Sequence, residues 1–142
     1  MLPRSILVSV FSLVFYLGAI IPALADAKAE QTAISVAGAW LNLVDQGRYN
    51  DSWQQAASIF QATVNKKQWA TSLQAIRQSL GKVISRKLNK KHYTHTLPGA
   101  ADGEYVVLEF YTVFEKKKNA VETVTPMLDS DGQWKVSGYY IR

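Results

Sequence analysis

The spacing of apolar residues changes once along the chain, at Gly81, and this change restricts the fold more than any other feature. Before Gly81, apolar side chains recur every three or four residues, as they do on one face of an amphipathic helix. After Gly81 they recur every second residue, which is typical of strands. The pattern therefore predicts an α+β domain in which helices come first and an antiparallel sheet follows.

About three helices are expected before Gly81. The first runs from Ala27 to Gln46, and the second begins at Asn50 or Asp51 and continues to about Phe60. The third covers Lys66 to Ser79. The side chains expected to face inward from these helices are Ala33, Val36, Ala37, Trp40, Leu41, Val44, Ala56, Ala57, Phe60, Trp69, Leu73, Ile76 and Leu80.

Four strands in an antiparallel meander are expected after Gly81. Their predicted ranges are Val83–Thr94, Glu104–Glu115, Val121–Leu128 and Gln133–Ile141, with a charged turn at Lys116–Asn119. Both faces of the second strand carry apolar side chains, so we expect a curved sheet that is covered, or closed around a pocket, on its concave side. Helices on such a sheet fit a nuclear-transport-factor-like or cystatin-like roll, and a plain two-layer sandwich is the alternative.

Residues 1–25 have the features of an export signal. Arg4 is followed by the uncharged apolar run from Ile6 to Ile21, and then by small residues up to Ala25. The predicted cleavage point lies between Ala25 and Asp26. An uncleaved anchor is less favoured, because a membrane-spanning helix needs about 20 apolar residues. We therefore expect a signal peptide over 1–25, a single domain over 26–142, and a periplasmic or secreted protein.

Composition excludes several classes of chemistry. The chain has no cysteine, which removes disulfides, thiolate nucleophiles and cysteine-bound zinc. No metal or other cofactor is expected. Loss of residues 1–25 removes only Arg4, so the net charge falls by one, from +5 to +4. This excess either serves solubility or gives weak contact with an anionic membrane or cell-wall surface, and nucleic acid is not an expected partner of an exported protein.

Arg86 and Glu122 are the first candidate pair for a ligand site. Both charges fall within predicted strands that are otherwise rich in β-forming residues. If both face the concave side, the planar guanidinium of Arg86 could bind a carboxylate or phosphate while Glu122 holds it in place. The alternative is a cross-strand ion pair that only fixes the register.

Glu109, Tyr111 and Glu122 are the candidates for catalysis. Glu109 and Tyr111 share one face of the second predicted strand, where the carboxylate could act as a base and the phenol as a hydrogen-bond donor. Glu122 is the alternative base. Nothing in their spacing is diagnostic, and a solvated strand face explains the first two equally. Among the aromatic residues, most are expected in the core, and Tyr49, Trp53 and Tyr139 are candidates for contact with a ligand.

A set of short segments spread over the predicted domain points to a family. The segments are Trp40–Tyr49, Ser52–Trp53, Leu80–Gly81, Ser85–Arg86, Leu97–Gly99, Gly103–Val107, Glu122–Thr123, Asp131–Gly132 and Trp134–Arg142. They resemble the exported bacterial domain-of-unknown-function family 4019. The resemblance implies a relationship to the nuclear-transport-factor-like superfamily, which includes isomerases, dehydratases and non-catalytic binding modules. It supplies no catalytic residue and no cofactor.

Three functions remain open from the sequence. The favoured one is a non-catalytic periplasmic module that binds a small molecule or an envelope protein, as a monomer or homodimer. The alternative is a small isomerase or dehydratase that uses Glu109 or Glu122 as its base. The third is a structural partner of the wall or membrane that uses surface lysines.

Overall fold

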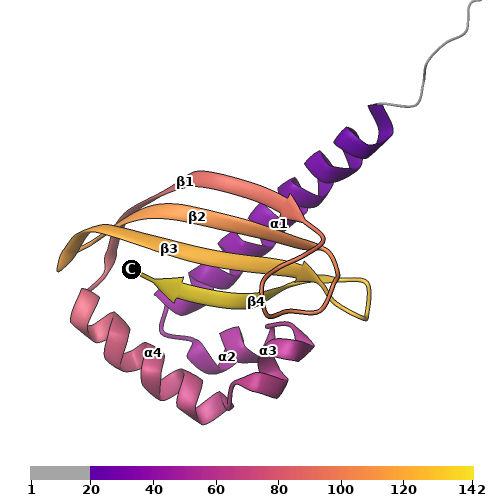
Figure 1. Cartoon of the computed structure of the whole chain (residues 1–142). Coiled ribbons are helices and arrows are strands. Elements are labelled where there is room, and N and C mark those ends of the chain that lie inside the picture. The colour runs from indigo at the N-terminus through magenta and orange to yellow at the C-terminus, as the bar shows by residue number, and fades with distance from the viewer. Residues whose placement is uncertain (1–19) are drawn as a thin grey trace, which may run out of the picture.

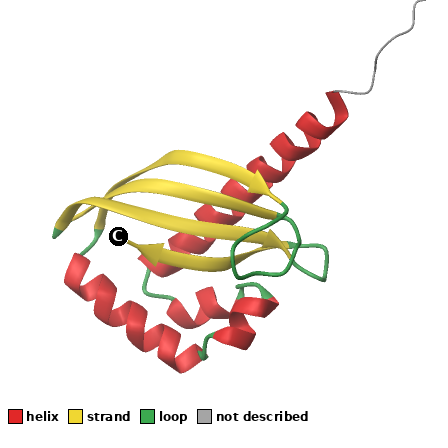
Figure 2. Ribbon diagram, viewed as in Figure 1, coloured by secondary structure: helices red, strands yellow, loops and turns green. Residues whose placement is uncertain are grey.

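The computed structural model describes residues 20–142, and it contains four helices followed by a four-stranded antiparallel sheet (Figures 1 and 2). The predicted α+β class, the order of elements and the meander are confirmed. The elements are α1 (Ile20–Asp45), α2 (Tyr49–Gln54), α3 (Ser58–Thr63), α4 (Lys66–Leu80), β1 (Val83–Thr94), β2 (Tyr105–Phe114), β3 (Lys117–Leu128) and β4 (Trp134–Ile141).

The strands follow the order β1-β2-β3-β4, so β1 and β4 are the two edges of an open sheet. Side chains alternate between the two faces, as expected for strands. The inner face of β2 carries Val106, Leu108, Phe110, Thr112 and Phe114, all buried. The predicted division of the β2 side chains between two faces is therefore confirmed for its apolar residues.

The helices cover one face of the sheet and one of its edges. Helix α1 runs behind the strands, while α2, α3 and α4 lie beside β4 (Figure 1). Between the helices and the sheet lies an aromatic cluster, in which Trp69 contacts Trp40, Phe60 and Tyr139 at ring-centroid distances of 5.9, 5.0 and 6.3 Å. The indole N–H groups of Trp40 and Trp69 both donate to the fully buried Ser52, at its carbonyl and its hydroxyl. Both polar ends of these large rings are thus satisfied inside the core.

The prediction of one helix from about Asn50 to Phe60 was wrong. The chain forms two short helices instead, and Ala57 between them has extended backbone angles of φ −61° and ψ 152°. Its N–H donates to the carbonyl of Val136 in β4, at 2.8 Å. In a continuous helix the N–H of Ala57 would bond to a carbonyl one turn earlier. Because it bonds to strand β4 instead, the helix is interrupted at Ala57.

Two predicted boundaries also differ from the structure. Helix α1 already includes residues 20–26, ahead of the predicted start at Ala27. Strand β3 begins at Lys117 rather than Val121, and only residues 115–116 form the turn before it. The backbone of residues 117–120 pairs with β2 but not with β4. The side chains of Lys117 and Lys118 still reach water there.

The predicted signal peptide lies mostly outside the described residues, which begin at Ile20. Within residues 20–142, no helix is both long enough and apolar enough to cross a membrane. The side chains of residues 22–28 in α1 are exposed, and this stretch contains the predicted cleavage point between Ala25 and Asp26. Cleavage at that point stays a prediction.

The turn between β3 and β4 holds α3 in place. Asp129 is buried, and its carboxylate accepts from the backbone N–H of Ser58 at 2.9 Å and from the Ser58 hydroxyl at 2.5 Å. These bonds satisfy a free N–H at the start of α3, so a residue distant in sequence acts as the helix cap. The Ser58 hydrogen bonds and the nearby Lys135 hold the pKa of Asp129 below its usual value, against the opposing effect of burial.

Replacement of Asp129 by alanine is expected to lower the free energy of unfolding by about 1–2 kcal/mol, the usual cost of losing a helix cap. The loss should be measured by urea denaturation. Asp131→Ala is the control, because Asp131 lies in the same turn, is exposed and bonds mainly to Lys135. An equal loss in both variants would show that the turn, rather than the cap on α3, carries the stability.

Candidate functional site

The most concentrated polar group in the structure surrounds Glu122, whose side chain is fully buried on the inner face of β3. Its carboxylate accepts from Arg86 Nε at 2.7 Å and from the Thr112 hydroxyl at 2.5 Å. The Tyr139 hydroxyl donates a short hydrogen bond to the other carboxylate oxygen. A buried carboxylate is tolerated only when it is paired and hydrogen-bonded, and these three donors meet that need.

Two further charged residues complete what we call the charge cluster: Asp45, Arg77, Arg86 and Glu122. Asp45 accepts from both terminal nitrogens of Arg86, at 2.7 and 3.0 Å, which is the two-bond geometry that planar guanidinium favours. Asp45 also accepts from Arg77 at 2.5 Å. The second terminal nitrogen of Arg77 lies 3.8 Å from Glu122. The four residues therefore balance two positive charges against two negative ones.

Four elements bring the charge cluster together. Asp45 is the last residue of α1, and Arg77 lies on α4 on the same stripe as the buried Trp69 and Leu73. The guanidinium of Arg77 also stacks over the Phe114 ring, 5.0 Å from its centroid. In the sheet, Arg86 on β1 is opposite Thr112, and Glu122 is opposite Phe110, so both charges point to the inner face.

The surroundings shift the pKa values of several of these groups. Burial raises the pKa of Asp45, but hydrogen bonds and charge from Arg86 and Arg77 outweigh this effect and leave the pKa below its usual value. Burial lowers the pKa of Arg86, and the two carboxylates more than reverse the change. Burial and the adjacent Glu122 raise the pKa of Tyr139. Asp45 and Arg86 are consequently held in their charged forms at neutral pH.

The structure brings the predicted pair Arg86 and Glu122 together. The guanidinium of Arg86 also bonds to Asp45, so it contacts two carboxylates. Its side chain is 16% exposed, and that of Asp45 is 25% exposed. Asp45 and Arg77 also line a groove of about 500 Å³ between the end of α1, α4 and the β2–β3 turn. A ligand anion would have to compete with Asp45 for Arg86, and a role for Arg86 in binding stays a prediction.

Glu109 and Tyr111 lie on the opposite face of the sheet from the charge cluster. Glu109 is 3.4 Å from Arg142 and 3.7 Å from Lys90, and Tyr111 is 56% exposed. They share the outer face with each other, as expected from their spacing, but none of the five described cavities has either residue in its wall. Their catalytic role stays a prediction.

The predicted aromatic contacts fall in three different places. Tyr49 lines the groove beside Asp45. Trp53 donates its indole N–H to the carbonyl of Val64 at 2.6 Å, with the ammonium of Lys66 5.7 Å from its ring centroid. Tyr139 bonds to Glu122. Residues 20–142 contain no group of three or more acidic or histidine side chains suited to a metal ion.

Sequence reasoning missed Asp45, Arg77 and Thr112. Arg77 follows Trp69 and Leu73 at intervals of four, so the helical spacing could have predicted that it is buried. Ile76 was predicted to face inward, but its side chain is 43% exposed. Thr112 follows the buried Leu108 and Phe110 on one face of β2 at intervals of two. Asp45, at the end of α1, has no comparable signal.

A second feature is an apolar groove of about 430 Å³ between α4 and β4, which we call the α4–β4 groove. Its lining residues are Trp69, Ser72, Leu73, Ile76, Leu80, Lys117, Tyr139, Tyr140, Ile141 and Arg142. Both charged residues in this set are cationic. The exposed Ile76 therefore belongs to a concave apolar surface rather than to an isolated position on the helix.

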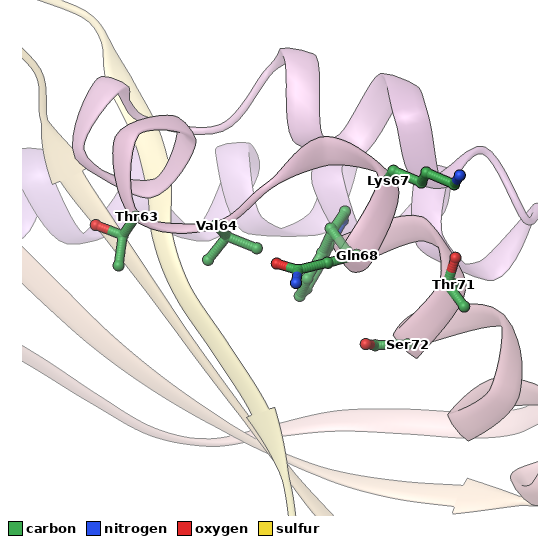
Figure 3. Close-up of a pocket in the computed structure, with 7 residues that line it drawn as sticks. Thr63, Val64, Lys67, Gln68, Thr71 and Ser72 are labelled. Atoms are coloured by element: carbon green, nitrogen blue, oxygen red, sulfur yellow. The ribbon is translucent and has the colours of Figure 1, made fainter.

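A larger hollow of about 560 Å³ follows the end of α3 and the start of α4 (Figure 3). The side chains shown there are mainly short and polar, and Lys67 extends away from Val64. This surface offers less apolar area for a ligand to bury than the α4–β4 groove does. The α4–β4 groove is the better candidate for binding.

Replacement of Glu122 by glutamine is expected to lower the free energy of unfolding by about 3–5 kcal/mol, because it leaves two arginines facing a single carboxylate in a buried site. Glu109→Gln is the matched control on the outer face, with an expected loss below about 1 kcal/mol. Urea denaturation measures both. Similar losses would contradict the central role given to Glu122.

The lowered pKa of Asp45 predicts that the free energy of unfolding depends on pH in the acid range. Because its folded pKa is lowered, its contribution is present above the unfolded pKa of about 3.9 and is lost as pH falls through the still lower folded pKa. Asp45→Asn should therefore be less stable than the parent chain near pH 6 and lose less stability on acidification. Denaturation midpoints measured from pH 6 to pH 2.5 test this expectation, and parallel pH curves for the two proteins would refute it.

Comparison with known proteins gives the chain a family but no activity. A family profile described as Protein of unknown function (DUF4019) matches residues 36–139, which include the whole charge cluster. A comparison with curated proteins found no match. The matched range extends from within α1 to within β4, so it takes in both the charge cluster and most of the α4–β4 groove. The chain belongs to the family Protein of unknown function (DUF4019).

Proposed function

We propose that this chain is an exported, non-catalytic module that binds a small molecule or an envelope protein in the α4–β4 groove. The observation that carries the proposal is the groove itself, in which the side chain of Ile76 stays 43% exposed among apolar lining residues. Large apolar side chains around a hollow favour an occupant that covers them.

The charge cluster supports a structural role for the buried polar groups. The carboxylate of Glu122 accepts hydrogen bonds from Arg86, Thr112 and Tyr139. These donors lie where a substrate would have to approach the carboxylate oxygens to give up a proton. A general base must reach the proton that it removes, directly or through one water. Binding of a ligand in the groove does not require the Glu122 carboxylate to reach a substrate proton. The proposal includes a relationship to the nuclear-transport-factor-like superfamily but does not depend on it.

The test uses the full chain expressed with its own leader and purified from the envelope fraction. Native mass spectrometry is expected to give a protein beginning at Asp26 that carries a non-covalent ligand or partner. Ile76→Glu should remove this adduct, because it places a charge in the apolar groove. Because Ile76 is partly exposed, the free energy of unfolding of the Ile76→Glu variant should differ from that of the parent chain by less than about 1 kcal/mol.

Ile59→Glu is the matched control. Ile59 is 56% exposed on α3 and does not line the groove, so this variant should keep the adduct. A bare monomer from the parent chain, or an adduct that both variants retain, would refute binding in the groove. A protein that keeps residues 1–25 would refute processing at Ala25 without bearing on the groove.

A further inference from the structure

The two edges of the sheet differ in their chemistry. Strand β1 carries exposed Lys87, Lys90 and Lys91 and has a bulge between Leu88 and Lys90. Lysines and bulges are the usual means by which an edge strand avoids pairing with another chain. The last residues of β4, Tyr139–Ile141, have neither, so this is the edge at which another strand can be added.

The backbone of β4 presents hydrogen-bonding groups to the α4–β4 groove. Val121 and Arg142 exchange both of their backbone hydrogen bonds, at 2.9 and 3.0 Å. Antiparallel pairs alternate between bonded and non-bonded positions, so Tyr140 also bonds to β3, while the N–H and C=O groups of Tyr139 and Ile141 point away from it. No hydrogen bond within residues 20–142 involves these outward groups. They form one wall of the groove.

We propose that the α4–β4 groove receives an extended segment of a partner protein, which pairs antiparallel with β4 as an additional strand. This inference rests on the proposed function and specifies the class of partner. At its far end the edge is already closed, because the carbonyl of Val136 accepts from Ala57. The added segment therefore pairs with Tyr139 and Ile141.

The groove also specifies the sequence of that segment. Residues opposite Ile141 and Tyr139 place their side chains on the inner side, where Leu73 and Ile76 of α4 offer apolar contact. The residue between them faces outward beside Tyr140. Antiparallel pairing puts the start of the segment near Lys117. The segment therefore has two apolar residues separated by one other residue, preceded by an acidic residue.

An acyl chain fits the groove less well than a strand. A hydrocarbon would cover the outward N–H and C=O groups of Tyr139 and Ile141 without bonding to them, and buried unpaired backbone groups are costly. A strand supplies partners for all of these groups as it buries the apolar surface.

The test is selection of binding peptides from a random library displayed on phage, with the purified protein as the target. Enriched peptides are expected to share the acidic residue and the two spaced apolar residues. The best peptide, synthesised with a fluorescent label, should bind the parent chain and slow hydrogen exchange at the Tyr139 and Ile141 amides by about tenfold or more, as new backbone hydrogen bonds form.

Matched variants locate the bound peptide. Ile76→Glu should weaken its binding by at least about tenfold, and Ile59→Glu should leave it unchanged. Lys117→Glu should weaken binding more than Lys118→Glu, because only Lys117 lines the groove. The difference between these lysine variants should shrink in high salt, where exposed charge contacts are screened.

Three outcomes would overturn the added strand: no enriched pattern, binding that is indifferent to Ile76→Glu, or unprotected Tyr139 and Ile141 amides. If oleate binds in an Ile76-dependent manner while no peptide does, the groove binds an amphiphile, so the strand is refuted and the binding module stands. If neither peptides, oleate nor the envelope-derived adduct depends on Ile76, the proposed function fails as well.

Discussion

The rest of the structure depends on a carboxylate that has no contact with water. Arg86, Arg77, Thr112 and Tyr139 surround the Glu122 carboxylate, and these residues come from β1, α4, β2 and β4. Asp45 then adds the end of α1 by bonding to both arginines. Apolar packing alone leaves neighbouring elements free to shift by small amounts, whereas charged hydrogen bonds fix distances and directions. The charge cluster therefore sets how α1 and α4 lie against the sheet.

Much of the fold could be predicted from the sequence because it follows from local spacing. The change in apolar period gave the order of helices and strands, and alternation along β2 gave its buried face. The break near Ala57 could not be found this way, because its cause is the carbonyl of Val136 in a strand far along the chain. The charge cluster shows the same limit: Arg86 and Glu122 stood out within strands, but Asp45 and Arg77 acquire their partners only when the helices dock.

The charge cluster and the α4–β4 groove meet at Tyr139. Its hydroxyl bonds to Glu122, its ring packs against Trp40 and Trp69, and its backbone lies along the groove. The last part of β4 is thus anchored from the inside, although only one neighbouring strand pairs with it. A rigid edge loses little conformational entropy when a partner binds, which favours affinity. Under the proposed strand addition, the buried charges would contribute to recognition without touching the partner.

The exposure of residues 22–28 in α1 has a consequence for the predicted processing of the chain. The first α1 side chain in the core is Ala33, and the first ion pair joins Glu30 to Lys91. Residues 22–28 are exposed, so none of residues 22–25, which the predicted cut after Ala25 would remove, has a packed side chain. The packing of the described core therefore does not depend on the side chains of residues 22–25. If the predicted cut after Ala25 occurs, the loss of residues 22–25 leaves the core intact, and a precursor that crosses a membrane unfolded would have to be captured before α1 docks.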